Sequence, residues 1–266
     1  MVKKYLIVGA DNCIGYALCK RLMLERELCV YGVNTRFNHY GNKSFKYALN
    51  RNVFDEVELL DNDCWAYLHK NDYDVIFWCD AVLTEHKYTN IRGKVDEFIK
   101  IMAGIRYQKI VFFINKFANI DKDRQSLPVE NCILMKIPNV YGLYQDKEDI
   151  IPRIILNDRI EEYSSSETCE DFVSAWSIAD AIINNHYIDL RKYTFSVRLK
   201  DLVIFFDKMK MNKTPDIEVC KKLLHINNDT KVKETIYYML EAMEFYMSNK
   251  MCYMAKRLNE EVAGKE

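Results

Sequence analysis

The feature that most constrains the fold is a short apolar run followed at once by a glycine-spaced turn and a helical pattern. The run is Tyr5–Val8, helical periodicity covers Ile14–Glu27, and the turn between them reads Gly9-Ala10-Asp11-Asn12-Cys13-Ile14-Gly15. In such a unit the first glycine permits the tight bend and the last permits close packing of helix on strand. The helix start then offers backbone N–H groups and a positive dipole to a pyrophosphate. The segment therefore predicts dinucleotide binding.

The turn departs from the usual pattern at its middle position. A glycine there lets the backbone approach the phosphates, and this chain has Asn12 instead. Asparagine tolerates positive φ better than most residues, so we expect the bend to survive. Its side chain crowds the phosphate site. This predicts that the dinucleotide binds more weakly, or that its pyrophosphate is held in a different way.

The residues after the second apolar run bear on the choice of dinucleotide. Cys29–Val33 is followed by Asn34 and, two residues later, Arg36. An NAD site usually has an acidic residue here to bind the ribose 2′-hydroxyl, whereas a basic residue suits the 2′-phosphate of NADP. Asn34 and Arg36 favour NADP slightly over NAD, with a solvated Arg36 as the alternative.

Apolar runs of strand length alternate with longer amphipathic stretches through the first half of the chain. This pattern is typical of a parallel sheet covered on both faces, with right-handed crossovers. It predicts a doubly wound α/β fold of the Rossmann type. The expected strands are Tyr5–Val8, Cys29–Val33, Phe45–Leu49, Val75–Cys79, Ile110–Ile114 and Cys132–Ile137, and the expected helices are Ile14–Glu27, Val57–Asn71 and Ile91–Arg106.

The second half reads as a smaller lobe on the first. We expect a dinucleotide-binding domain at 1–145, with contributions from later segments, and a C-terminal lobe at 146–266. Its expected elements are a helix at Ile150–Asn157, a strand at Asp171–Val173, a helix at Ile178–Asn185 with Ser177 as its N-cap, a strand at Tyr193–Val197 and a helix at Val232–Leu258. The last helix carries an apolar stripe of Met, Tyr and Phe, which predicts core packing or a dimer face.

Composition excludes several classes of function. The net charge is −1 and the basic residues are scattered, which gives no footprint for nucleic acid. The nine cysteines contain no CxxC pair and the five histidines are isolated, so no metal site is predicted. The first apolar run is too short for a signal peptide, and no stretch approaches a membrane span. We expect reduced thiols and a cytoplasmic protein without membrane contact.

Several segments follow one another along the chain in a characteristic order: VGADNCIG (Val8–Gly15), DVIFWCDA (Asp74–Ala81), Asn90-Ile91-Arg92-Gly93, ILMKIPNVYG (Ile133–Gly142) and EDFVSAWSIADAI (Glu170–Ile182). Together they resemble the extended short-chain dehydrogenase/reductase family, the NAD-dependent epimerase/dehydratase group of nucleotide-sugar enzymes. The resemblance implies a Rossmann domain, a C-terminal substrate lobe and a bound nucleotide-diphosphate sugar. It also implies a set of cofactor-binding positions: Gly9, Asp11, Asn12, Cys13, Ile14, Gly15, Asn34, Arg36, Asn50, Cys79, Asp80, Ala81 and Asn90.

The catalytic residues of the family do not carry over. It uses a Tyr-x-x-x-Lys pair and a hydroxyl residue after the fifth strand. This chain has no hydroxyl residue there before Ser126 and no tyrosine between Tyr107 and Tyr141. The comparison implies that the segment carrying the pair is deleted and that the chain is a degenerate member. The same spacing recurs at Tyr16/Lys20 and Tyr246/Lys250, at about the frequency that chance gives.

Three functions stay open at this point. The first is a pseudoenzyme that binds NAD(P) and a nucleotide-diphosphate sugar and serves as a binding or regulatory subunit. The second is an active epimerase, dehydratase or reductase that uses Lys116, Asn115 or Tyr141, although a solvated Lys116 and a structural Tyr141 are the plainer interpretations. The third is a scaffold that no longer binds dinucleotide. A homodimer through the apolar stripe is a further expectation.

Overall fold

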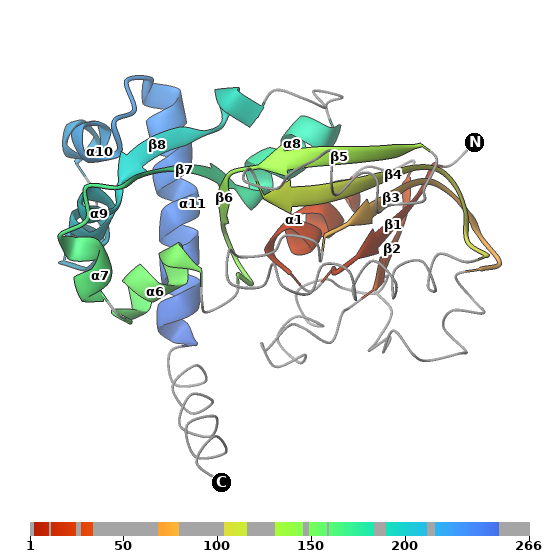
Figure 1. Ribbon diagram of the computed structural model, residues 1–266, viewed down its shortest axis with the longest axis horizontal. Helices are drawn as coiled ribbons and strands as arrows, with labels where there is room; N and C mark the ends of the chain where they lie inside the picture. Colours follow the sequence, from red (N-terminus) through yellow and green to blue (C-terminus); the bar gives the residue numbers. More distant parts are fainter. Residues whose placement is uncertain are drawn as a thin grey trace, which may run out of the picture. The chain divides into compact units, whose positions relative to one another are not determined.

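The computed structural model describes residues 3–10, 12–24, 28–33, 69–79, 104–115, 131–145, 149–158, 160–183, 190–211 and 216–249 (Figure 1). The chain divides into two compact units, Met1–Val140 with Ala175–Lys192 and Tyr141–Ser174 with Tyr193–Glu266. The first division lies at residue 140, where the sequence led us to expect it at residue 145. Each unit is built from two separate stretches of chain, because residues 175–192 return to the first unit.

The first unit contains a parallel sheet of five strands in the order β2-β1-β3-β4-β5 (Figure 1). The strands are β1 (Lys3–Val8), β2 (Leu28–Val33), β3 (Asp72–Trp78), β4 (Arg106–Asn115) and β5 (Cys132–Ile137). The end of β1 is buried on both faces, because consecutive Leu6, Ile7 and Val8 are 0% exposed. The predicted α/β class with a parallel sheet is confirmed. Phe45–Leu49 lies outside the described residues.

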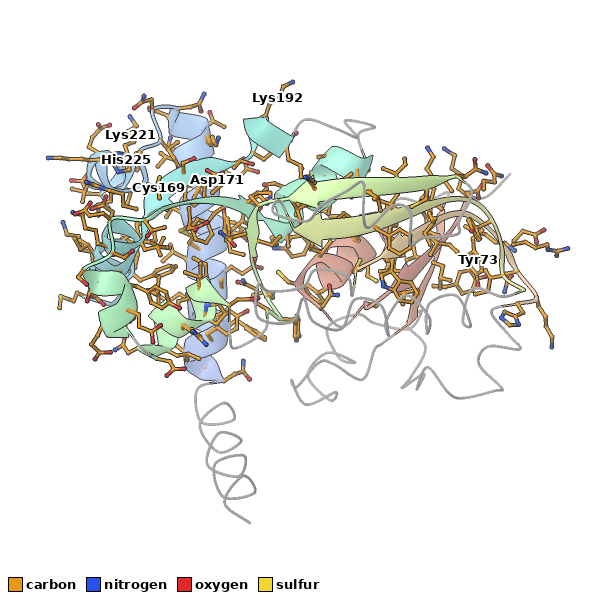
Figure 2. All side chains as sticks on the ribbon, in the orientation of Figure 1. Tyr73, Cys169, Asp171, Lys192, Lys221 and His225 are labelled. Carbon is orange, nitrogen blue, oxygen red and sulfur yellow. The ribbon has the colours of Figure 1, made fainter. Side chains whose placement is uncertain are left out.

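Aromatic side chains on neighbouring strands contact one another in the sheet of the first unit. Tyr73 is buried on β3 and its ring meets Tyr31 of β2 edge to face, with the centroids 5.6 Å apart (Figure 2). Phe77 stacks on Tyr5 of β1 and on Phe113 of β4, at 6.1 and 6.4 Å. These rings link neighbouring strands beyond their backbone ladder, which stabilises the sheet that carries the candidate site.

Two helices of the first unit pack against each other: α1 (Cys13–Leu22) and α8 (Ala175–Ile183). A short 3₁₀ turn, η2 (Leu190–Lys192), also belongs to this unit. The predicted N-cap at Ser177 is wrong, because α8 begins at Ala175 and Ser177 is buried in its first turn. The predicted helix end at Arg106 is wrong as well, because Arg106 opens β4 after Gly104, which has φ +94°. Most of the other two predicted helices, Val57–Asn71 and Ile91–Arg106, lies outside the described residues.

The second sheet has three strands in the order β6-β7-β8, and β7 and β8 run antiparallel. The strands are β6 (Asn139–Tyr141), β7 (Cys169–Ser174) and β8 (Phe195–Arg198). The helices of the second unit are α6 (Ile150–Leu156), α7 (Ile160–Ser164), α9 (Leu199–Met211), α10 (Ile217–Leu224) and α11 (Asp229–Ser248). In the described part of the chain, no helix combines the length and apolarity that a membrane crossing requires.

Helix α11 organises the core of the second unit. It packs against α6 and α10 and buries the side chains of Val232, Ile236, Met239, Ala242 and Tyr246. The apolar stripe seen in the sequence therefore packs inside this unit, which favours its interpretation as core. The stripe was predicted to run to Leu258, and the described helix ends at Ser248.

Candidate functional site

The candidate site lies at the carboxyl end of β1, where the strand order of the sheet reverses. β1 pairs with β2 on one side and with β3 on the other. In open parallel sheets, ligands bind outside the carboxyl ends of the strands at such a switch point. The amide of Cys79, directly after β3, donates to the carbonyl of Val8 at 2.9 Å. This bond brings Cys79 beside Gly9, the residue that follows β1.

The two glycines of the turn have the roles that the sequence predicted. Gly9 has φ 82°, a left-handed conformation that bends the chain sharply out of β1. At Gly15 a Cβ atom would lie 1.9 Å from the carbonyl oxygen of Gly9. The start of α1 is therefore pressed against the end of β1, and only glycine fits at residue 15.

Asn12 takes part in the turn differently from the expectation. Its φ of −98° and ψ of 172° are extended, so the bend needs no positive φ at this residue. Its side-chain Oδ1 accepts a hydrogen bond from the Gly15 amide at 2.8 Å, which makes Asn12 the N-cap of α1. Its backbone N–H donates to the Gly9 carbonyl at 3.1 Å, and its carbonyl accepts from Tyr16 at 2.8 Å. Asn12 thus organises the helix start with both its backbone and its side chain.

Contacts with α8 hold α1 in place. The Tyr16 ring meets Trp176 edge to face at 5.9 Å, and the guanidinium of Arg21 lies 5.4 Å from the Trp176 ring centroid. The Nε of Arg21 also lies 3.0 Å from the carboxylate of Asp180. Burial raises the pKa of Asp180, and Arg21 opposes that shift. Residues 159 positions apart are paired here, and the linear sequence gave no signal for the pairing.

The two Tyr-x-x-x-Lys matches have packing roles where the structure describes them. The Lys20 ammonium lies 6.0 Å from the ring centroid of Tyr16, whose side chain is buried between the helices. Tyr246 is fully buried in the second unit and Lys250 lies outside the described residues. Neither described tyrosine is exposed to act on a ligand.

Tyr141, one of the catalytic candidates, is deeply buried in the second unit. Its side chain is 2% exposed, and its hydroxyl is hydrogen-bonded to Thr235 and Ser174. Burial raises the pKa of Tyr141 far above its ordinary value, against the smaller lowering effect of these bonds. The phenol is therefore neutral at physiological pH.

The structure brings together part of the predicted cofactor site. Gly9, Asn12, Cys13, Ile14, Gly15 and Cys79 lie around the carboxyl ends of β1 and β3. Asn115 is the last residue of β4, where only its backbone is described. The remaining predicted positions lie outside the described residues: Asp11, Asn34, Arg36, Asn50, Asp80, Ala81, Asn90 and Lys116.

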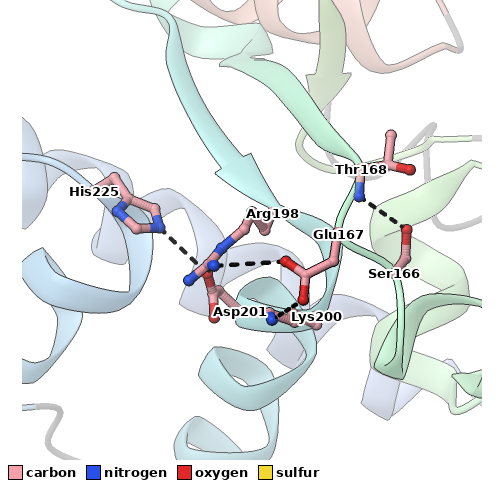
Figure 3. A network of polar contacts seen from close by, with 7 residues as sticks. All are labelled: Ser166, Glu167, Thr168, Arg198, Lys200, Asp201 and His225. Atoms are coloured by element: carbon pink, nitrogen blue, oxygen red, sulfur yellow. Dashed lines mark hydrogen bonds and ion pairs between the residues drawn. The ribbon is translucent and has the colours of Figure 1, made fainter.

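A second polar cluster lies in the other unit, around the first turn of α9 (Figure 3). The buried Asp201 carboxylate accepts from Arg198 Nε at 2.6 Å and lies 3.2 Å from His225 Nε2. Glu167 bonds Lys200 and lies 3.6 Å from Arg198. Burial alone would raise the pKa of Asp201, but the hydrogen bonds and charges of Arg198 and His225 outweigh it and lower that pKa. The charged groups of this cluster form hydrogen bonds and ion pairs with one another, so we interpret the cluster as structural.

Comparison with known proteins identifies the fold. No protein-family model matches the sequence, and no curated protein matches it. UDP-glucuronic acid 4-epimerase from Bacillus cereus, solved with UDP-glucuronic acid and NAD, superposes with a TM-score of 0.62 at 13% identity, over 92% of this chain and 99% of that one. The Bordetella bronchiseptica enzyme WbmF, solved with NAD+ and UDP, gives 0.64 at 15% identity, over 98% and 97%.

Both solved neighbours hold NAD, so the comparison does not support the slight preference for NADP that the sequence suggested. At such low identity the likeness concerns the backbone alone. It agrees with the parallel sheet described above. The chain has a Rossmann-like α/β fold that matches the fold of these two solved enzymes.

Proposed function

We propose that this protein binds NAD at the carboxyl ends of β1 and β3, with the pyrophosphate at the start of α1. The observation that carries the proposal is the absence of room for a side chain at Gly15, whose Cβ would meet the Gly9 carbonyl oxygen at 1.9 Å. This close approach aims the first-turn amides of a ten-residue helix at the switch point of the sheet. Gly9, Asn12, Cys13, Ile14 and Gly15 would line the phosphates, and Cys79 would lie beside them.

We further propose that the second ligand is a nucleotide-diphosphate sugar and that the protein binds it without turning it over. The ligand class is supported by the solved neighbours, which hold UDP-glucuronic acid or UDP. The lack of turnover is supported by the sequence, which has no tyrosine between Tyr107 and Tyr141 to form a Tyr-x-x-x-Lys pair. The buried, hydrogen-bonded state of Tyr141 and Tyr246 agrees with it, because neither hydroxyl is available as an acid or base. The protein would then act as a binding or regulatory subunit that carries NAD.

Two measurements on the purified protein test the proposal. Calorimetric titration with NAD+, NADH and NADP+ is expected to show binding of NAD+ or NADH, accompanied by a rise in Tm. A panel of UDP-sugars, monitored by absorbance at 340 nm and by product analysis, is expected to show no turnover.

The outcomes separate the parts of the proposal. Turnover of a UDP-sugar that is abolished by Lys116→Ala would replace the regulatory role with an active enzyme. Failure of every dinucleotide to bind or to raise the Tm, even near millimolar concentration, would overturn NAD binding itself. A Kd for NADP+ well below that for NAD+ would overturn the choice of cofactor.

A further inference from the structure

At the start of α1, one backbone amide already donates to a hydrogen-bond acceptor within the protein. The first-turn N–H groups of this helix belong to residues 12 to 15. Two of them donate within the turn: Asn12 to the Gly9 carbonyl at 3.1 Å, and Gly15 to the Asn12 side chain at 2.8 Å. The Asn12 oxygen therefore occupies a place just beyond the helix end, along the direction from which an anion must approach.

The same type of cap occurs at the start of a second helix of the chain. Asn228 caps α11 through its own Oδ1, which accepts from the Lys231 amide at 2.9 Å. The spacing of cap and donor is three residues in both helices. The two asparagines differ in their surroundings, because only Asn12 lies in a turn whose closing glycine has no room for a side chain.

We propose that Asn12 is an internal competitor for the dinucleotide phosphate and that it sets the affinity of the site. This inference rests on the proposed function. The tethered amide oxygen satisfies the Gly15 N–H in the free protein, and NAD must displace it before a phosphate oxygen can take that place. The start of α1 therefore stays capped in the free protein. Breaking this cap bond reduces the net free energy of NAD binding by the stability that the bond contributed.

Substitutions at Asn12 test this competition, because different substitutions are expected to shift the Kd for NAD in opposite directions. Asn12→Gly removes the competing oxygen while glycine remains a good N-cap residue, so the Kd for NAD is expected to fall about twofold. Asn12→Asp keeps the acceptor and adds a negative charge, so the Kd is expected to rise at least about tenfold. Asn228→Gly removes the matching cap from α11 and is expected to leave the Kd unchanged.

The experiment is titration of the full-length chain and these variants with NAD, with the Tm of each variant measured alongside. A Kd for Asn12→Gly equal to or weaker than wild type overturns the inference and leaves the proposed function standing. Absence of NAD binding in both wild type and Asn12→Gly overturns the proposed function and the inference together. If Asn12→Gly does not fold, Asn12→Ala removes the same oxygen and is held to the same outcomes.

Discussion

The hydroxyl of Tyr246 donates a hydrogen bond of 2.8 Å to the carbonyl of Gly142, 104 residues earlier in the chain. The same oxygen accepts from the Gln145 amide at 2.9 Å. The side-chain oxygen of Gln145 in turn accepts from the Gly142 amide at 3.2 Å. One phenol on α11 thus fixes both ends of the turn that follows β6.

We predict that Tyr246→Phe destabilises the protein by about 2 to 3 kcal/mol. The ring still packs, but a buried carbonyl and a buried amide lose their partner, and such groups are costly to leave unsatisfied. Thermal or urea unfolding measures the change. Tyr237→Phe is the matched control on the same helix. Tyr237 is 64% exposed, so water can take over any hydrogen bond that its hydroxyl makes. Equal stability of the two variants would contradict the role given to Tyr246.

Gly15→Ala is expected to destabilise the protein by at least about 2 kcal/mol. In an exposed helix the same change gains about 1 kcal/mol. Here the new Cβ would lie 1.9 Å from the Gly9 oxygen and 2.9 Å from Ala10 Cα, and backbone must move to admit it. Urea unfolding of Gly15→Ala beside Ala17→Gly in the same helix measures the effect. A Gly15→Ala protein as stable as wild type would disprove the close approach of α1 to β1.

The Arg21–Asp180 pair is expected to show a coupling free energy of about 0.5 to 1 kcal/mol in a double-mutant cycle with Arg21→Met and Asp180→Asn. The value is modest because the side chains are 33% and 30% exposed. The Arg106–Asp72 pair of the same unit is the control. Its side chains are 72% and 69% exposed, and its coupling is expected to be smaller. Coupling that is equal in the two pairs would mean that the contact between α1 and α8 adds nothing to this ion pair.

Asp201 is expected to contribute to acid sensitivity. Arg198 and His225 hold its folded-state pKa below the usual value, which is about 3.9 in unfolded chains, so its contribution to stability is present above that pH. The contribution is lost as the pH falls through the folded-state pKa. Asp201→Asn should therefore flatten the fall in unfolding free energy below about pH 4. Asp207→Asn, at a 50% exposed position on the same helix, is the control and should leave that slope unchanged.

The sequence predicted the first unit better than the second. Four of the described strands overlap a predicted apolar run closely, and Cys132–Ile137 matches β5 at both ends. The glycine turn was predicted for the right physical reason, since Gly9 has positive φ and Gly15 has no room for a side chain. Local patterns suffice here because strand, turn and helix are consecutive.

The second unit was predicted less well, in part because one of its helices follows directly on a strand. α9 begins at Leu199 immediately after β8, without a glycine or proline to mark the change. Its buried Leu202, Phe206 and Met209 have helical spacing, which was the signal available. The caps Asp216 and Asn228 also marked the starts of α10 and α11. The partners of Arg21 and Tyr246 could not be read from the sequence, because they depend on where the chain returns.

The return of α8 to α1 has a consequence for synthesis of the chain. Arg21 and Asp180 are separated by 159 residues, so α1 leaves the ribosome long before its partner exists. At about 5 to 20 residues per second, translation takes roughly ten to thirty seconds to cover that distance. Throughout this interval the nascent chain has to keep the Tyr16 side of its first helix from aggregating, and a fragment that stops before Ala175 would never cover it.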